Sequence, residues 1–399
     1  MPEDPSVGLI YFLLCLAAVP ATISCLYLGL MTLLSWRAPT PQPASRSLRF
    51  DILVPAHNEA AVIERTVASL RQIDWPADRM RVVVIADNCA DDTAQLAAAA
   101  GATVIERRDE TLRGKGYALA HGIAHSAAGQ WADAIAVVDA DTVVSPNFLS
   151  AFAARIEQGA QALQANYGVL NPDDSWRTRI ITIAYGAFHA VRGRARERLR
   201  VSCGLRGNGM GFTHALLRDH PFRSVSLTED LEQGIVLGLE GIRVWYVDEA
   251  HADAELVASG SASVSQRQRW EGGRFAVIRI YTGRLLRAGL TRPDRICMDL
   301  ALDLLTLPIG YVALEIGALL VLALLAALVT PAAWAWAGWA VLMGIILGAH
   351  ILRGWQLGPL GPRALLDLAR APFFVLWKLH ALLRRRGEQG WVKTRRDGR

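Results

Sequence analysis

Acidic side chains recur along the middle of this chain at positions where they could hold a metal ion and a phosphate. Asp87 follows one apolar run, and Asp139 and Asp141, separated by one alanine, follow another. Two carboxylates so spaced at a strand end can turn toward one ligand, and hard oxygen donors of this kind suit Mg²⁺ or Mn²⁺, which bridge phosphate oxygens. Lys115, on a turn bounded by glycines, can reach a phosphate as a point charge.

Two further clusters could serve a transfer reaction. Asp230, in Thr-Glu-Asp at residues 228–230, begins a helical stretch and could take a proton from an attacking hydroxyl. An acidic residue in a first helical turn also has a capping explanation. Gln-Arg-Gln-Arg-Trp at residues 266–270 combines groups that could clamp a leaving diphosphate and offer a sugar an aromatic face. The same residue types are favoured at a membrane interface.

Alternating apolar runs and amphipathic stretches would position these side chains. The pattern predicts strands at 50–54, 82–86, about 103–106 and 135–138, and helices at 59–73, 91–100 and 117–125. This order indicates an α/β fold with a mostly parallel sheet and helices on both faces. Ligands bind outside the carboxyl ends of such strands, where Asp87 and Asp139 fall. Neither a Walker motif nor a Gly-x-Gly-x-x-Gly motif follows the first strand, which disfavours an NTPase or a nicotinamide enzyme.

Apolar stretches toward both ends predict membrane crossings. With 52% hydrophobic residues and a mean hydropathy of +0.24, the 399-residue chain is too apolar to be wholly soluble. Residues 7–36, 308–329 and 334–351 are each long and apolar enough to span a bilayer. An acidic leader (Glu3, Asp4) and a long apolar run argue against a cleaved signal peptide. Arginines after the first span place the next domain in the cytoplasm.

Charge and cysteine usage narrow the function classes. The net charge of +5 is small and concentrates near the apolar segments, so it indicates a membrane surface rather than a nucleic-acid partner. The five cysteines form no Cys-x-x-Cys pair, which makes a zinc site or a disulfide framework unlikely and agrees with a reducing compartment.

Three other segments are assigned to the region of the membrane surface. Residues 176–200 are amphipathic and rich in arginine, and two interpretations stay open: a helix lying in the bilayer interface, or a helix packed on the sheet with a solvated basic face. Residues 287–305 carry Asp299 and Asp303 and are expected to form an interfacial lead-in to the second span. Charges in residues 364–383 favour a surface-lying helix there.

In combination, the motifs resemble the membrane-bound inverting glycosyltransferases of GT-A fold, the broad family 2 group that includes cellulose, chitin and hyaluronan synthases and ceramide glucosyltransferases. The resemblance covers about residues 49–274. It rests on Val-Pro-Ala-His-Asn-Glu at 54–59, Ala-Asp-Asn-Cys-Ala-Asp-Asp-Thr at 86–93, Gly-Lys-Gly at 114–116, Asp-Ala-Asp at 139–141, Thr-Glu-Asp at 228–230 and Gln-Arg-Gln-Arg-Trp at 266–270. Cys89 departs from the family's more familiar Asp-Gly-Ser, which leaves base selectivity open.

The resemblance implies a role for each matching residue. Glu59 and Asp87 would contact the nucleoside of a UDP-sugar, Asp139 would lie near the ribose and diphosphate, Asp141 would ligate Mg²⁺ or Mn²⁺ beside Asp139, and Asp230 would be the catalytic base. The donor would also be bound by Lys115, Gln266, Arg269 and Trp270. The acceptor would be bordered by Glu229, Gly207, Asn208, Gly209 and, again, Trp270. Residues 391–395 loosely resemble a gating loop.

The implied organisation is a transmembrane helix at 1–37, a linker at 38–48, a cytoplasmic GT-A domain at 49–280, and interfacial helices, about two further spans and a basic tail at 281–399. The expected function is sugar transfer from a nucleotide-sugar donor, UDP-hexose, to a lipid or lipid-linked saccharide at the cytoplasmic side of the inner membrane. The alternative is a processive polysaccharide synthase, but about three crossings are few to line a polymer channel. A catalytically dead scaffold would have lost an acidic cluster, and none is missing.

Overall fold

The four predicted strands form one half of the sheet. In the computed structural model, which describes residues 5–37, 40–41, 45–224, 226, 228–256 and 260–373, they lie side by side and parallel in the order β3-β2-β1-β4. Their bounds are β1 (Phe50–Ala56), β2 (Met80–Asp87), β3 (Thr103–Arg107) and β4 (Ala134–Val137). All four β4 residues are buried, as expected for a strand covered by helices on both faces.

The other half of the sheet makes it mixed. It continues as β7-β6-β8-β5, where β7 runs antiparallel to both β4 and β6, and β5 runs antiparallel to β8. Only β6 and β8 are parallel there. The bounds are β5 (Thr142–Val144), β6 (Ala162–Val169), β7 (Met210–Thr213) and β8 (Val244–Ala254). The α/β class with helices on both faces is therefore confirmed, and the parallel part of the sheet is mainly the half formed by β3, β2, β1 and β4.

Alternate residues of the strands point into two separate cores. Ile52 and Val54 of β1 pack with the helices on one face, while Leu53 packs on the other. The first face is covered by α2 (Ile63–Arg71), α3 (Thr93–Ala99) and α5 (Phe148–Glu157), with the 3-10 turn η1 (Ala77–Arg79) leading into β2. The second is covered by α4 (Lys115–Gly129), α8 (His214–Asp219) and α9 (Glu229–Leu239).

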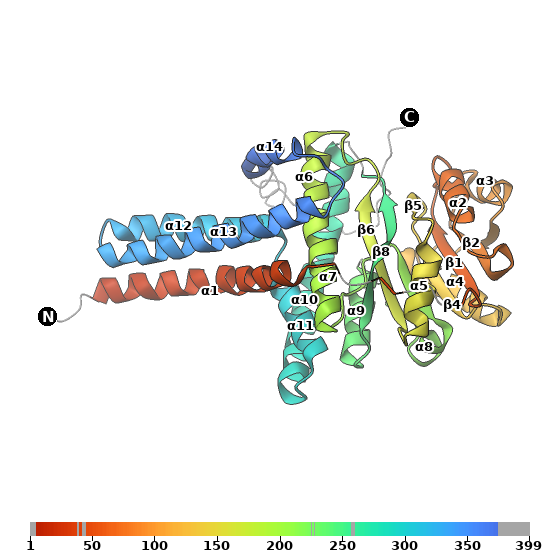
Figure 1. Ribbon diagram of the computed structural model, residues 1–399, viewed down its shortest axis with the longest axis horizontal. Coiled ribbons are helices and arrows are strands. Elements are labelled where there is room, and N and C mark those ends of the chain that lie inside the picture. Colours follow the sequence, from red (N-terminus) through yellow and green to blue (C-terminus); the bar gives the residue numbers. More distant parts are fainter. Residues whose placement is uncertain are drawn as a thin grey trace.

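The basic segment 176–200 stands between the sheet and the apolar helices (Figure 1). It comprises α6 (Trp176–Tyr185), the π-helical stretch η2 (Gly186–Val191) and α7 (Arg192–Leu199), and it contacts β6, β8, α1 and α13. Packing on the sheet was one of the two interpretations, but its solvated basic face was wrong for Arg192 and Arg196, which are 1% and 0% exposed. Their guanidinium groups are buried because carboxylates of a later helix pair with them.

Three long apolar helices project together from the sheet domain (Figure 1). These are α1 (Pro5–Leu34), α12 (Ile309–Ala327) and α13 (Trp334–Gln356), the last preceded by the turn η3 (Pro331–Ala333); among the described residues they are the three candidate spans. Small side chains let them pack closely, since Ala18, Ala323, Ala337 and Ala340 share one buried cluster. The three predicted apolar stretches are thus confirmed as helices.

Two helices connect the sheet domain to these candidate spans. α10 (Gly260–Thr291) carries the Gln-Arg-Gln-Arg-Trp string, and its side chains are described from residue 272 onward. α11 (Arg295–Leu305) is the segment predicted as an interfacial lead-in; its Asp299 and Asp303 are buried against α7. The expected helix at 364–383 begins as α14 (Ala364–Asp367) and η4 (Leu368–Arg370), and residues 374–399 lie outside the described part.

Candidate active site

Lys115 is the meeting point of the predicted donor and acceptor groups. It is the first residue of α4, and its Nζ forms an ion pair with Asp139 Oδ1, just beyond β4, while donating to the carbonyl oxygen of Gly207 at 2.7 Å. Burial lowers the lysine pKa, but the carboxylates of Asp139, Glu229 and Asp230 outweigh that cost and raise it overall. Three segments far apart in the sequence therefore converge on one ammonium group.

The loop 207–209 closes against this lysine. A Cβ atom on Gly207, where φ is +80°, would stand 3.1 Å from Asp230 Oδ2 and 3.5 Å from Lys115 Nζ. Glycine is required here because the left-handed backbone and the crowding both exclude a side chain. Asn208 fixes the loop: its Oδ1 accepts from the Asp139 amide at 3.1 Å and its Nδ2 donates to Thr142 Oγ1 at 2.9 Å.

Glu229, which is buried, and Asp230, which is half-buried, open α9 as two adjacent carboxylates. Burial is the main cause that raises the pKa of Glu229 to about 7, and the Asp230 carboxylate adds to it, while Lys115 opposes both. Burial likewise raises the pKa of Asp230, again opposed by Lys115 and, to a smaller extent, by the guanidinium of Arg206. A carboxylate whose pKa is raised toward neutrality can accept and return a proton near physiological pH, which is the property that a general base needs.

Tyr167 shows that the remaining carboxylates lie nearby. Its ring is on β6, and burial raises its pKa well above the ordinary value, with Asp139, Asp141 and Asp230 each contributing. The predicted metal ligands Asp139 and Asp141 and the predicted base Asp230 therefore all interact electrostatically with the Tyr167 hydroxyl. Asp139 and Asp141 offer hard oxygen donors, a set that suits Mg²⁺ or Mn²⁺ when substrate phosphates complete the coordination. Among the residues described, no group of three or more His, Cys, Asp or Glu could hold a metal without such help.

The predicted nucleoside residues lie at the ends of β1 and β2. Asp87 is nearly buried and pairs with Arg107 of β3, with 2.7 Å between Asp87 Oδ1 and Arg107 Nη1. Arg107 also pairs with Asp109 at 3.1 Å, so one guanidinium holds two carboxylates at the sheet edge. Sequence reasoning missed Arg107. The signal was its place at the end of the neighbouring strand, where it is the β3 partner of Asp87 in the register.

Two loops with left-handed asparagines shape this edge. Asn58 (φ 54°) and Asn88 (φ 52°) allow tight turns after β1 and β2, and Asn58 Oδ1 accepts from the Ala90 amide at 2.7 Å. The amide of Glu59 is held by Thr93 Oγ1 at 2.8 Å, which places the predicted nucleoside residue on this rim. His57 Nδ1 is 2.7 Å from the carbonyl oxygen of Asp87 and thereby ties the two loops together.

For the predicted diphosphate clamp at residues 266–270, the structure describes the backbone alone. Gln266, Arg269 and Trp270 lie on α10, but their side chains are outside the described set. α10 nevertheless approaches the start of α9, because a Cβ on Gly273 would stand 2.4 Å from Thr228 Cγ2, directly before Glu229. The gating-loop prediction for residues 391–395 also lies outside the described residues.

This chain is similar in sequence to known proteins. Residues 48–273, more than half of the chain, match the family model for "Glycosyltransferase like family 2". Similar curated proteins include a glucomannan 4-beta-mannosyltransferase of Arabidopsis thaliana, 24% identical over 248 residues (59% of this chain, 44% of that protein), and a cellulose synthase catalytic subunit of Komagataeibacter xylinus, 25% identical over 285 residues (65% and 35%). This chain spans less than half the length of either.

A solved structure supports the same fold. The mannosyltransferase PcManGT from Pyrobaculum calidifontis, in complex with GDP-Man and Mn²⁺, superimposes with a TM-score of 0.55 and 18% identity, covering 85% of this chain and 99% of that one. At 18% sequence identity, this similarity shows that the two proteins share a fold. Together with the family match across the whole sheet domain, it leads to one conclusion: the chain belongs to glycosyltransferase family 2.

Proposed function

We propose that this protein is a membrane-bound, metal-dependent inverting glycosyltransferase that moves a hexose from a nucleoside diphosphate donor, UDP-hexose, to a hydroxyl of a lipid or lipid-linked saccharide at the cytoplasmic face of the inner membrane. The observation that carries this proposal is the convergence of Asp139, Asp230 and Lys115 at Gly207. Such a junction of cation and carboxylates serves a donor diphosphate on one side and an acceptor hydroxyl on the other.

On the donor side, fixed charges hold the substrate before reaction. Asp87, oriented by Arg107, and Glu59 would bind the nucleoside, and Asp139 with Asp141 would hold Mg²⁺ or Mn²⁺. The metal would neutralise charge on the leaving diphosphate, and Lys115 would add a further positive charge next to it. The Mn²⁺ and GDP-Man in the complex of the Pyrobaculum calidifontis mannosyltransferase support this part.

On the acceptor side, Asp230 would accept the proton of the attacking hydroxyl. Attack on the anomeric carbon forms the new glycosidic bond, the bond to the diphosphate breaks, and the proton goes to the Asp230 carboxylate. A single displacement of this kind inverts the anomeric configuration. The raised pKa of Asp230 and the adjacent Glu229 both favour uptake of that proton. Gly207, Asn208 and Gly209 would bound the acceptor because their loop lies against Asp230.

Single addition is supported by the packing of the candidate spans. The α1, α12 and α13 helices contact one another directly and share buried side chains along their length. Side chains therefore fill the space between these three helices. A polymer would need another route. The processive alternative is supported instead by the sequence similarity to a glucomannan mannosyltransferase and to a cellulose synthase catalytic subunit.

The test is product analysis with the purified full chain in detergent. UDP or GDP release is measured across a panel of UDP-hexoses and GDP-mannose, with Mn²⁺ or with EDTA, and with or without an extracted lipid fraction. We expect metal-dependent, lipid-stimulated release and a single sugar added with inverted configuration. Asp230→Asn should lose at least ~10³-fold in turnover while binding UDP as tightly as the parent, because it removes only the base. Unchanged turnover would refute the base assignment, and a polymer ladder formed without lipid would favour the processive synthase.

A further inference from the structure

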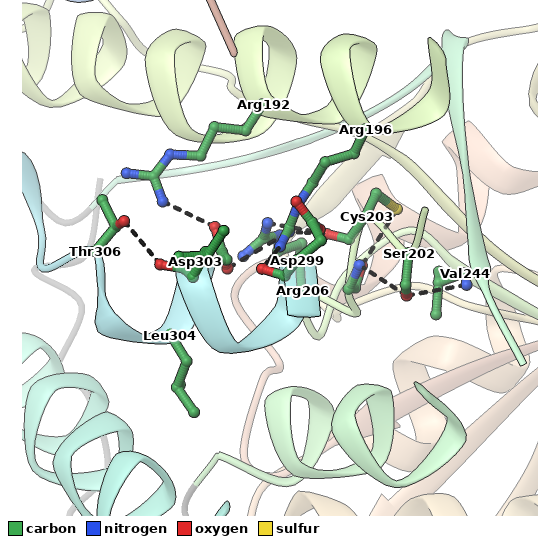
Figure 2. A network of polar contacts seen from close by, with 12 residues as sticks. Arg192, Arg196, Ser202, Cys203, Arg206, Val244, Asp299, Asp303, Leu304 and Thr306 are labelled. Atoms are coloured by element: carbon green, nitrogen blue, oxygen red, sulfur yellow. Dashed lines mark hydrogen bonds and ion pairs between the residues drawn. The ribbon is translucent and has the colours of Figure 1, made fainter. Parts of the chain in front are cut away.

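A buried network of arginines lies between the candidate spans and the active site. Asp303 of α11 pairs with Arg192 at 2.9 Å and with Arg196 at 3.4 Å, and Asp299 pairs with Arg196 at 2.8 Å. Figure 2 shows these side chains of α7 and α11 pointing toward one another, with Arg206 beside them. Tyr27 of α1 donates to Asp299 at 3.1 Å, which links the network to the first apolar helix.

The network contains more positive than negative charge. Four guanidinium groups, those of Arg192, Arg196, Arg206 and Arg274, all act to lower the pKa of Asp303, and their net effect exceeds the burial that raises it. Among the described residues, the carboxylates set against them are those of Asp299 and Asp303 of α11 and, for Arg206, that of Asp230, so four cations face three anions. Arg274 donates to the carbonyl oxygens that end α11, at 2.6 Å for Asp303 and 3.1 Å for Thr306, rather than to a described carboxylate.

Arg206, like Arg274, has no carboxylate ion-pair partner among the described residues, and it adjoins the 207–209 loop of the candidate active site. Among the described residues it forms no ion pair; its Nη2 donates to the Cys203 carbonyl at 3.0 Å and its Cζ stacks 4.0 Å from the Phe188 ring centroid. Burial, together with Arg196 and Arg192, lowers its pKa despite Asp303. Its residue is partly exposed and directly precedes Gly207, and its charge acts on the base residue Asp230.

Two buried arginine nitrogens of the network also lack a described hydrogen-bond acceptor. The Nε atoms of Arg192 and Arg274 have no hydrogen-bond partner within the described part of the chain. Unpaired buried donors are costly, and a ligand that supplies oxygen acceptors removes this cost. A phosphate offers several acceptor oxygens and negative charge, the chemistry that arginine recognises best.

We propose that this arginine network, with Arg206 as its partly exposed member, binds the phosphate of an anionic lipid acceptor and so places the acceptor's hydroxyl beside Asp230. The inference rests on the proposed function and names its acceptor class: a phosphate-bearing lipid rather than a neutral one. The position agrees with such a ligand, because the network contacts α1 on one side and the Gly207 loop on the other. The lipid phosphate is not the nucleophile, so the transfer step is unchanged.

The test is binding of defined probes to the full chain in a neutral detergent, followed by isothermal titration calorimetry. The probes are dodecyl phosphate, dodecanol as its neutral match, and inorganic phosphate. We expect dodecyl phosphate to bind at least about tenfold more tightly than either of the others. Arg206→Gln should weaken that binding about tenfold, since one charge-assisted contact is lost. Arg198→Gln, on the exposed side of α7, should change it less than twofold.

Several outcomes would overturn the proposal. Equal binding of dodecanol would show that the chain recognises only the alkyl tail, and equal binding of inorganic phosphate would show a free-anion site. Unchanged binding in Arg206→Gln would exclude Arg206. If Arg206→Gln folds poorly, Arg206→Lys is the second variant, because it keeps the positive charge. It should bind dodecyl phosphate more tightly than Arg206→Gln does, and equally weak binding by both variants would contradict the proposal. UDP binding measured in the same samples separates the two proposals: a chain that binds dodecyl phosphate through Arg206 but no nucleotide keeps this site and loses the transferase assignment.

Discussion

Replacing Glu229 by glutamine should make the protein more stable at pH 8 and leave its stability almost unchanged at pH 4.5. Glu229 opens α9 as a buried carboxylate beside Asp230. Because burial and Asp230 raise its pKa from 4.5 to about 7, the folded state binds this proton more tightly than the unfolded state does. Between those values the unfolded chain loses the proton first, so stability falls as the pH rises through the window.

The size of the effect follows from the same numbers. A rise from 4.5 to about 7 corresponds to roughly 3 kcal/mol at ~1.4 kcal/mol per pH unit, and this penalty is complete once the pH exceeds 7. Glutamine has nearly the same shape and no charge to desolvate, so Glu229→Gln should recover a large part of that energy at pH 8. It should also lower the pKa of Asp230, because the two carboxylates repel each other.

The assay is thermal unfolding in detergent followed by tryptophan fluorescence, at one scan rate from pH 4.5 to 8.5. The midpoint difference between Glu229→Gln and the parent should grow across pH 4.5–7 and then stay constant at several degrees. Glu240→Gln, an exposed position at the other end of the same helix, is the matched control and should show no such trend. A difference independent of pH, or a variant less stable at pH 8 than at pH 5 relative to the parent, would refute the reasoning.

Three further predictions address neighbouring contacts. Lys115→Met should lower kcat/KM for sugar transfer by ~10²-fold or more, measured as nucleotide release, because Asp139 and the α9 carboxylates lose their shared cation; an effect below threefold would contradict its role. Gly207→Ala should reduce kcat by at least ~10-fold with the donor KM nearly constant, since the new Cβ meets Asp230 Oδ2 at 3.1 Å in a left-handed backbone; a parallel rise in KM would argue against an acceptor-side loop. Asp303→Asn should destabilise the chain by about 3–5 kcal/mol by leaving buried arginines unpaired, seen as a lower unfolding midpoint in detergent, whereas an unchanged midpoint would show that the network contributes little.

The half of the sheet formed by β3, β2, β1 and β4 could be predicted because its signals are local. Each of β1, β2 and β4 is a short run of apolar residues, and a polar motif follows β2 and β4 directly. Since the carboxyl ends of parallel strands meet at one sheet edge, Asp87 and Asp139 were placed correctly without knowledge of the register. Thr228-Glu229-Asp230 was likewise predicted to begin a helix, and α9 spans Glu229–Leu239 as expected.

The half of the sheet formed by β7, β6, β8 and β5 could not be predicted because its determinants are non-local. β5 has three residues and β7 has four, too few for a periodic pattern, and both are defined by pairing with distant strands. The arginines of α7 look solvent-exposed in the sequence. Only the carboxylates of α11, about a hundred residues later, explain why Arg192 and Arg196 are buried.

One contact between backbones ties the third candidate span to this arginine-bearing region. A Cβ on Gly354 of α13 would come within 2.5 Å of the Ala187 amide nitrogen in η2, and one on Gly186 would come within 2.3 Å of the Gly354 carbonyl oxygen. Glycine at both positions lets the helices touch with no side chain between them. Helices in a bilayer of unmatched thickness respond by tilting. Because of this contact, a tilt of α13 would also move η2 and the sheet domain that packs against it. The chain length of the surrounding lipids should therefore set the height of the candidate active site above the headgroups.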